Sequence, residues 1–407
     1  MRWLPLVLVL AGCDVWVADL PPVDDPQPAA IPEVMDAGTT VDAGSLVDSG
    51  TVTSATDAGT IDAGVDAGVV VDAGVEPEVD AGTPFDAGTR TVEVLIAQGR
   101  FGRTTLSCDE GRTWILDRDE ANGADCDDPG VDCWHDQWSS MGLVSSGNAV
   151  LASWGWGAVP GRVRRTSDGV TWTDVTTSTR FGAISAGAGT VVGATNPVLV
   201  SHADGTTGTW STGGDLMTGQ VTRLATFIPG SGGRFVIALD GEFRASDDLG
   251  ESWFALNLPS NCAMPPALSL LASGSTLVLV HWQGTVCTST DRGGTWTQQS
   301  LAAAFSSRGV HAQGAFFLWN GATRFRSTDG LTWTSANGSP NDVAIGAVAV
   351  TSTGTFVAFK GGWQSEYQYE RAYRSTDGLT WTVMPSPRSH PITHLISARL
   401  SASSACP

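Results

Sequence analysis

The sequence predicts an all-β protein, a seven-bladed β-propeller with four-stranded antiparallel blades, and three observations predict it. One short turn motif, found in full at 289–296, recurs seven times along the chain. Strand-like runs accompany the copies in sets of four, most clearly over 221–258. One extra strand-like run, 392–398, follows the last copy. Repeats of roughly 35–50 residues that each supply one small sheet are typical of a propeller.

The motif reads Ser-Thr-Asp-Arg-Gly-Gly-Thr-Trp at 289–296. An Asp in a tight turn accepts hydrogen bonds from the backbone N–H groups that follow it, and Gly provides a positive φ. The flanking Ser or Thr and the Thr-Trp pair favour strands, so the motif is expected to bend a β-hairpin whose Trp packs onto its neighbours. The Asp and Trp residues assigned to the seven copies are Asp109 and Trp114, Asp168 and Trp172, Asp204 and Trp210, Asp247 and Trp253, Asp291 and Trp296, Asp329 and Trp333, Asp377 and Trp381.

These seven copies resemble the Asp-box (BNR) repeat of sialidases and related β-propellers, and the resemblance covers residues 92–400. It implies a sialidase-like superfamily fold. It also implies that the motif is a structural element that lies away from any active site.

The amino-terminal residues predict export. Met1-Arg2 precedes the apolar run 3–10, which is too short to span a membrane as a helix, and Leu-Ala-Gly-Cys follows at 10–13. This ending resembles the lipobox of bacterial lipoproteins, which implies a signal peptide at 1–12 and a lipidated Cys13. A plain signal peptide cut elsewhere and an N-terminal membrane anchor are the alternatives. With lipidation, the chain is expected to be a cell-envelope protein held by the lipid bilayer of the inner or outer membrane, facing the periplasm or the cell surface.

Residues 13–91 form an acidic linker that repeats Asp-Ala-Gly eight times at irregular spacing. Low hydrophobicity and high charge predict a disordered tether, and a calcium-collecting tail is the alternative. The formal net charge of −20 comes largely from this segment and argues against nucleic-acid binding.

The propeller is predicted over 92–407, and its ends predict how the ring closes. The first unit has only three strand-like runs, 92–97, 103–108 and 113–116, and lacks an innermost one. The run 392–398 is expected to fill that position, which removes an exposed sheet edge. We expect the protein to be a monomer.

The cysteines predict disulfides. Six remain after Cys13, and an even number in an exported chain is expected to be oxidised. Six thiols allow fifteen pairings. From the expected fold we infer Cys108–Cys406 across the ring closure, Cys126–Cys133 within a loop and Cys262–Cys287 within one blade. A metal site among the cysteines is the weaker alternative.

The face opposite to the repeat turns is the predicted recognition surface, because the second-to-third strand loops lie there. Tryptophans gather on these loops and strand ends, and an indole stacks on a sugar while polar groups take the hydroxyls. Filling the wedges between blades is the alternative for each of them. The ligand-binding candidates are Trp134, His135, Trp154, Trp156, Trp282, Trp319 and Trp363, with Trp138 on the same face.

Cofactors are not expected. The aspartates of the loop 117–132 would suit calcium, but their spacing is not that of an EF-hand, so a solvated loop held by a disulfide is favoured. Four histidines fall on the same face, and we expect hydrogen-bonding roles for them rather than a metal site. They are His135, His281, His390 and His394.

The resemblance to sialidases implies a Tyr nucleophile with a Glu partner, an Asp acid/base and three arginines. The residue types on the predicted face are Glu366, Tyr367, Tyr369 and Arg371. However, the Arg-Ile-Pro signature is missing and sialidases have six blades. We therefore expect a membrane-anchored envelope lipoprotein that binds a glycan or a protein partner without catalysis. The alternatives are a sialidase-like glycoside hydrolase (an exo-sialidase) and an assembly scaffold.

Overall fold

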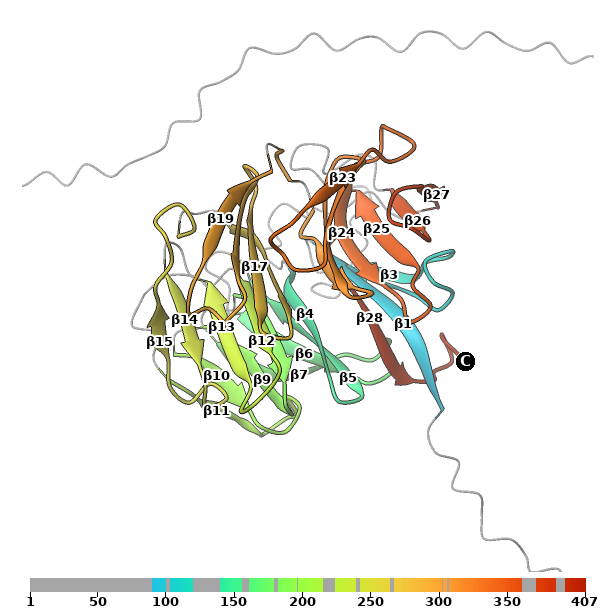
Figure 1. Ribbon diagram of the computed structural model, residues 1–407. Helices are drawn as coiled ribbons and strands as arrows, with labels where there is room; N and C mark the ends of the chain where they lie inside the picture. The colour runs from blue at the N-terminus through green and yellow to red at the C-terminus, as the bar shows by residue number, and fades with distance from the viewer. Residues whose placement is uncertain are drawn as a thin grey trace, which may run out of the picture. The chain divides into compact units, whose positions relative to one another are not determined.

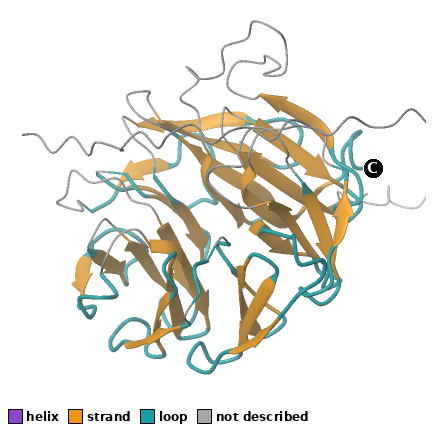
Figure 2. Cartoon of the chain, turned by 90° about the horizontal axis from the view of Figure 1, so that it is seen from above, coloured by secondary structure: helices purple, strands orange, loops and turns teal. Residues whose placement is uncertain are grey.

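The structure is a computed structural model, and the part of the chain that it describes is the predicted propeller. The described residues are 90–99, 103–119, 140–155, 161–178, 182–195, 197–214, 224–238, 242–263, 267–301, 303–305, 307–360, 371–385 and 392–407. They consist of strands and connecting loops, and they include no helix long and apolar enough to cross a membrane (Figure 2). The predicted leader, Cys13, almost all of the linker and the Cys126–Cys133 pair lie outside these residues.

The described residues form seven four-stranded antiparallel sheets, which we number as blades 1 to 7. Each blade is given below from its innermost strand outward. They are blade 1, β28 (Ile392–Ser401), β1 (Thr91–Gly99), β2 (Arg103–Ser107) and β3 (Ile115–Asp119); blade 2, β4 (Ser140–Ser146), β5 (Ala149–Trp154), β6 (Gly161–Thr166) and β7 (Thr173–Ser178); blade 3, β8 (Ile184–Gly187), β9 (Thr190–Gly193), β10 (Leu199–Ser201) and β11 (Trp210–Thr212); blade 4, β12 (Leu224–Ile228), β13 (Arg234–Ala238), β14 (Phe243–Ser246) and β15 (Phe254–Leu256); blade 5, β16 (Ala267–Ser273), β17 (Thr276–His281), β18 (Thr285–Ser289) and β19 (Thr297–Ser300); blade 6, β20 (Val310–Ala312), β21 (Ala315–Asn320), β22 (Thr323–Ser327) and β23 (Thr334–Ala336); blade 7, β24 (Ile345–Val350), β25 (Phe356–Lys360), β26 (Ala372–Ser375) and β27 (Thr382–Met384).

The blades form a closed ring. Their innermost strands are neighbours in the order β28, β4, β8, β12, β16, β20 and β24, and β24 contacts β28 again. The fold is therefore the predicted seven-bladed β-propeller.

Ring closure occurs as the sequence predicts. Strand β28 pairs antiparallel with β1, from Thr91↔Ser401 to Gln98↔His394, and the two lie side by side in Figure 1. The disulfide Cys108–Cys406, with Cα atoms 5.5 Å apart, ties the third strand of blade 1 to the segment that follows β28. The second confirmed disulfide, Cys262–Cys287, lies in blade 5, with Cα atoms 5.9 Å apart.

The hydrophobic core lies between blades. Seven clusters of buried side chains each join two neighbouring sheets. In β1, Val94 and Ile96 pack toward blade 2, whereas Leu95 and Ala97 pack toward blade 7. Both faces of such a strand are buried, which is why the middle strands are apolar runs rather than alternating sequences.

The repeat turn at 289–296 is held by its own polar side chains. Ser289 Oγ donates to Asp291 Oδ1 (2.7 Å) and accepts the N–H of Gly293 (2.8 Å). Asp291 also accepts the N–H and the hydroxyl of Thr295, at 2.8 and 2.7 Å. Positive φ angles at Arg292 (62°) and Gly293 (96°) close the turn. The same Ser or Thr to Asp hydrogen bond recurs in blades 1, 2, 4, 6 and 7.

Two of the assigned aspartates are corrected by this geometry. In blade 4 the turn carboxylate is Asp248, which accepts from Ser246 (2.8 Å) and from the Ser252 N–H (2.9 Å), so the assignment of Asp247 is wrong. Asp247 instead binds Arg234 through two hydrogen bonds of 2.6 Å. The sequence places two aspartates side by side there, and only the second has the motif spacing.

In blade 3 the turn aspartate is absent. Ala203 occupies its position, and Asp204 has a positive φ of 51° like Arg292 in blade 5. Asp204 accepts a hydrogen bond of 2.6 Å from Ser146 in blade 2, so it ties two blades together instead of closing its own turn. The turn is closed by Thr206 and Thr209, whose hydroxyls donate to carbonyls within it.

The motif tryptophans are inter-blade anchors, as predicted. Each packs in the cluster between its own blade and the preceding one, as Trp114 does against Phe359, with ring centroids 4.7 Å apart. Because Ser252 and Trp253 bond within the turn, only Phe254–Leu256 of the predicted run 252–258 pairs as a strand.

Candidate functional site

Two of the predicted ligand-binding tryptophans are buried. Trp154 is 2% exposed and Trp319 is fully buried. The indole N–H of Trp319 donates to the carbonyl of Gly378 in blade 7 at 2.9 Å. Both side chains fill the wedge between neighbouring blades, so the expectation that they present ring faces to a ligand is wrong.

Trp282 differs from them because its side chain is 46% exposed. It lies between β17 and β18, at the end of the blade opposite to the repeat turn that follows β18. The Trp282 carbonyl accepts a hydrogen bond of 2.8 Å from the N–H of Phe305. Two residues further on, Gly284 has no room for a side chain, because a Cβ there would lie 2.1 Å from the Ala303 carbonyl oxygen. The segment that links blade 5 to blade 6 thus holds the main chain beside the exposed indole.

Most other predicted site residues lie outside the described residues. These are Trp134, His135, Trp138, Trp156, Trp363, Glu366, Tyr367, Tyr369, His390 and the loop 120–132.

Of the catalytic candidates, Arg371 is described. Its side chain is 49% exposed and faces Asp342 at 3.7 Å. The nearby Tyr373 is buried against Trp381 between blades 6 and 7. No observation in the described part of the chain favours a glycosidase site around Arg371.

The described histidines and acidic residues do not cluster as metal ligands. Among the described residues there is no group of three or more His, Cys, Asp or Glu side chains that would hold a metal ion. His281 is buried, and its Nε2 lies 3.1 Å from the carbonyl oxygen of Cys262.

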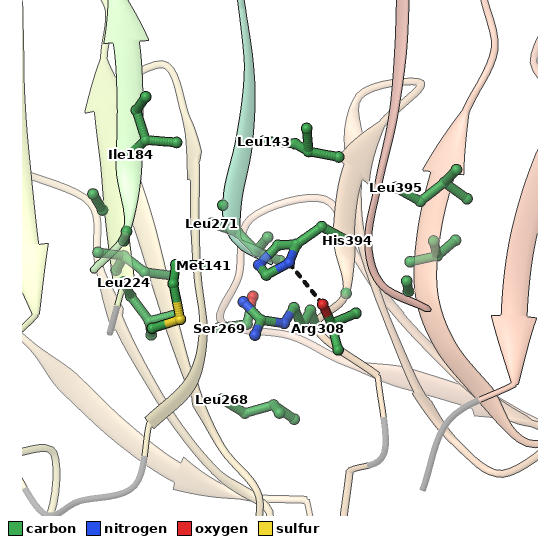
Figure 3. A pocket seen from close by; sticks show the side chains of 18 residues that line it. Met141, Leu143, Ile184, Leu224, Leu268, Ser269, Leu271, Arg308, His394 and Leu395 are labelled. Atoms are coloured by element: carbon green, nitrogen blue, oxygen red, sulfur yellow. Dashed lines mark hydrogen bonds between the residues drawn. The ribbon is translucent and has the colours of Figure 1, made fainter. Parts of the chain in front are cut away.

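A pocket of about 190 Å³ occupies the axial channel, where all seven innermost strands meet (Figure 3). Its lining comes from the first half of these strands, as with Met141–Leu143 of β4 and Leu268–Leu271 of β16. These strands run toward the repeat-turn face, so the pocket lies toward the opposite face. Most of the residues that line it are apolar. Leu143, Leu268, Leu271 and Leu395 are half-buried, whereas Ile184 and Leu224 are buried between blades.

Two titratable side chains, Arg308 and His394, point into this apolar pocket (Figure 3). Arg308 precedes β20 in blade 6, and its pKa is lowered from 12.5 to about 10 because the surrounding protein removes water from the guanidinium. It therefore remains a cation at neutral pH. No described residue forms an ion pair or a hydrogen bond with it.

His394 comes from β28, the strand that closes the ring. Its Nδ1 lies 3.0 Å from Thr393 Oγ1, and its Nε2 is buried with no hydrogen-bond partner among the described residues. Burial and the nearby charge of Arg308 hold the pKa of this imidazole well below its usual value. The ring is therefore neutral at pH 7.

The sequence pattern did not reveal this pair. His394 was expected to be an ordinary hydrogen-bonded residue, and Arg308 was not singled out because β20, only three residues long, gives a weak strand signal. The one available signal was its place in the repeat, because Arg308 lies two residues before the innermost strand β20. Chemically, a cation that points into a pocket suits the binding of an anion.

Comparisons with known proteins concern the fold. No family model matches the chain, and none of the curated proteins matches it. Among solved structures it is similar to YCF48 from Cyanidioschyzon merolae, with 16% identity over 63% of this chain and 87% of that chain and a TM-score of 0.46. It is also similar to a catalytically inactive virginiamycin B lyase from Staphylococcus aureus with Quinupristin, with 13% identity over 65% of this chain and 93% of that chain and a TM-score of 0.48.

Proposed function

We propose that the protein is a lipid-anchored lipoprotein of a bacterial envelope whose propeller recognises a glycan or a protein partner without catalysing a reaction. The recognition surface is the face opposite to the repeat turns. The Leu-Ala-Gly-Cys sequence at 10–13 supports the anchor, and the acidic linker supports a tether that holds the propeller away from the membrane. We further propose that the repeat turns are Asp boxes, on the basis of their Ser–Asp–Thr hydrogen bonds.

One observation carries the recognition surface: the exposed indole of Trp282 stands on a main chain that is already fixed. A large aromatic group held rigidly at the surface loses little conformational entropy when it binds, and it offers an apolar face to a sugar or to an apolar side chain. The repeat turns are a poorer surface for recognition, because their polar groups are engaged in their own hydrogen bonds.

The anchor is tested by labelling the full-length chain with an alkyne-bearing palmitate in a bacterial host. We expect wild type to carry the label and to remain with the membranes, and Cys13→Ser to lose both. Label retained on Cys13→Ser would contradict the anchor at this residue.

Recognition is tested with the full-length protein on a glycan array and in pull-downs from envelope extracts. Trp282→Ala is expected to weaken any ligand found by about 10-fold or more, since a hot-spot aromatic contributes about 2 kcal/mol or more. Phe254→Ala is the matched control, because Phe254 is 42% exposed on the outermost strand β15. Equal binding by both variants would remove Trp282 from the recognition surface.

A further inference from the structure

Arg308 combines two features: it lines the axial pocket, and none of the described residues forms an ion pair with its guanidinium. The protein has 42 Asp and Glu residues against 22 Lys and Arg, so carboxylates are plentiful. Other described arginines use them: Arg234 bonds Asp247 and Arg374 bonds Glu110, at 2.6 and 2.7 Å. Among the described residues none plays this role for Arg308.

A cation that lies half-buried in a pocket, with no ion-pair partner among the described residues, is less well solvated than one in open water, which is unfavourable for folding. This loss of solvation is offset when an anion enters the pocket and binds the guanidinium. We propose that the axial pocket binds a small monocarboxylate with a short apolar body, held through the guanidinium of Arg308.

The chemistry of the pocket selects this class of ligand. A planar guanidinium offers two parallel N–H groups, which match the two oxygens of a carboxylate. Four half-buried leucines of the lining would contact an apolar body rather than a hydroxylated one: Leu143, Leu268, Leu271 and Leu395. A volume of about 190 Å³ equals roughly six water molecules, so the ligand is a short acid. One fixed cation balances one negative charge, which favours a monocarboxylate over a doubly charged phosphate.

His394 gives the proposed site a pH dependence. Among the described residues, the lining side chains that titrate are Arg308, from the segment before β20, and His394 of β28. The described lining residues of the other five innermost strands are apolar or small and polar. A bound carboxylate neutralises the charge of Arg308. It also accepts a hydrogen bond from Nε2 when His394 is protonated. The pKa of His394 is then higher in the complex than in the free protein. Affinity therefore increases as pH falls through the pKa of the complex.

The experiment measures binding of hexanoate to the full-length protein by calorimetry, with hexan-1-ol and hexylamine as uncharged and cationic probes of the same length. We expect binding of hexanoate alone, a loss of about 10- to 100-fold in Arg308→Met, and a smaller loss in Arg308→Lys. Arg326→Met, which removes a cation of β22 outside the pocket lining, is the matched control and is expected to bind like wild type. As pH is lowered below about 6.5, the affinity of wild type is expected to increase, and that of His394→Gln to stay level.

Thermal unfolding without ligand separates a binding role of Arg308 from a structural one. We expect Arg308→Met to unfold at the same temperature as wild type or higher, because it removes a poorly solvated charge that has no ion-pair partner among the described residues. The proposal is overturned by a clearly lower unfolding temperature for this variant, by equal hexanoate binding in Arg308→Met, or by no binding up to about 10 mM. Inorganic phosphate binding more tightly than hexanoate would also overturn it. None of these outcomes involves Trp282, so they leave the proposed recognition surface untouched.

Discussion

At the scale of single residues, the repeat turn shows how one carboxylate organises eight residues. The Asp at the third position accepts a hydrogen bond from the hydroxyl that ends the strand before the turn and another from an amide near the end of the turn, so it holds the turn of the outer hairpin closed. The residue that follows it in the longer turns has a positive φ and reaches the preceding blade, as Glu110 and Asp204 do. One short motif thus closes a hairpin and joins two blades.

The adjacent Asp247 and Asp248 separate these roles experimentally. Asp248→Ala removes the acceptor of Ser246 and Ser252, and we expect the free energy of unfolding to fall by about 1–3 kcal/mol. Asp247→Ala breaks an ion pair whose carboxylate is 49% exposed, and we expect a loss of about 0.2–1 kcal/mol. Urea unfolding of both variants measures the difference. A larger loss for Asp247→Ala would contradict the assignment of Asp248 to the turn.

The turn carboxylates also predict acid sensitivity. The amide of Thr295, followed by its hydroxyl and that of Ser289, lowers the pKa of Asp291 from 3.8 to about 2 against the opposing effect of burial. A carboxylate with a lowered pKa stabilises the fold at pH values above its unfolded pKa, and this contribution is lost as pH falls from about 4 toward 2. Unfolding free energies measured over this range should fall less steeply for Asp291→Asn than for wild type. An unchanged slope would contradict the prediction.

At the scale of elements, burial on both faces decides what a strand-end tryptophan does. Trp319 ends a strand whose two faces both meet neighbouring blades, so its indole is buried and its N–H bonds Gly378. Trp282 belongs to the link beyond its strand and remains exposed. A difference of two residues in register separates a core side chain from a surface one.

This difference predicts opposite mutational effects. Trp319→Phe shrinks a buried side chain and leaves the Gly378 carbonyl without its donor, so we expect a loss of about 2–3 kcal/mol in unfolding free energy. Trp282→Ala is expected to change stability by about 0.5 kcal/mol or less. Chemical denaturation of the two variants checks both values, and a larger effect at Trp282 would show that its indole packs in the core.

The strands and the ring closure could be predicted because they follow from local patterns. The Asp-Gly turns mark hairpins, and the unpaired run 392–398 fits the one vacant innermost position. The burial of Trp154 and the pocket around Arg308 could not be predicted, since both depend on which side chains of neighbouring blades meet. Such contacts join residues far apart in the chain and leave no periodic signal.

At the scale of the whole molecule, the ring is closed twice, by the pairing of β1 with β28 and by Cys108–Cys406. The disulfide spans 298 residues, whereas Cys262–Cys287 spans 25. A cross-link that closes a longer loop restricts the unfolded chain more. The expected stabilisation is about 6 kcal/mol for Cys108–Cys406 and about 3.5 kcal/mol for Cys262–Cys287.

Replacing both cysteines of each pair by serine tests this ranking. We expect Cys108→Ser with Cys406→Ser to lower the denaturant midpoint of the full-length chain more than Cys262→Ser with Cys287→Ser does. Guanidinium unfolding without reductant makes the comparison, and the reverse order would indicate that strand pairing alone holds the ring shut.

Because Thr91 pairs with Ser401, blade 1 is completed only after the end of the chain has been synthesised. At about 5–20 residues per second, a ribosome needs roughly 15–60 s to make the chain between these two partners. During that interval β1 has an unoccupied edge, and blades 2 to 7 are able to assemble before blade 1 is complete. Chaperones that bind nascent strands would therefore be needed longest at blade 1, which is the first blade to be synthesised and the last to be completed.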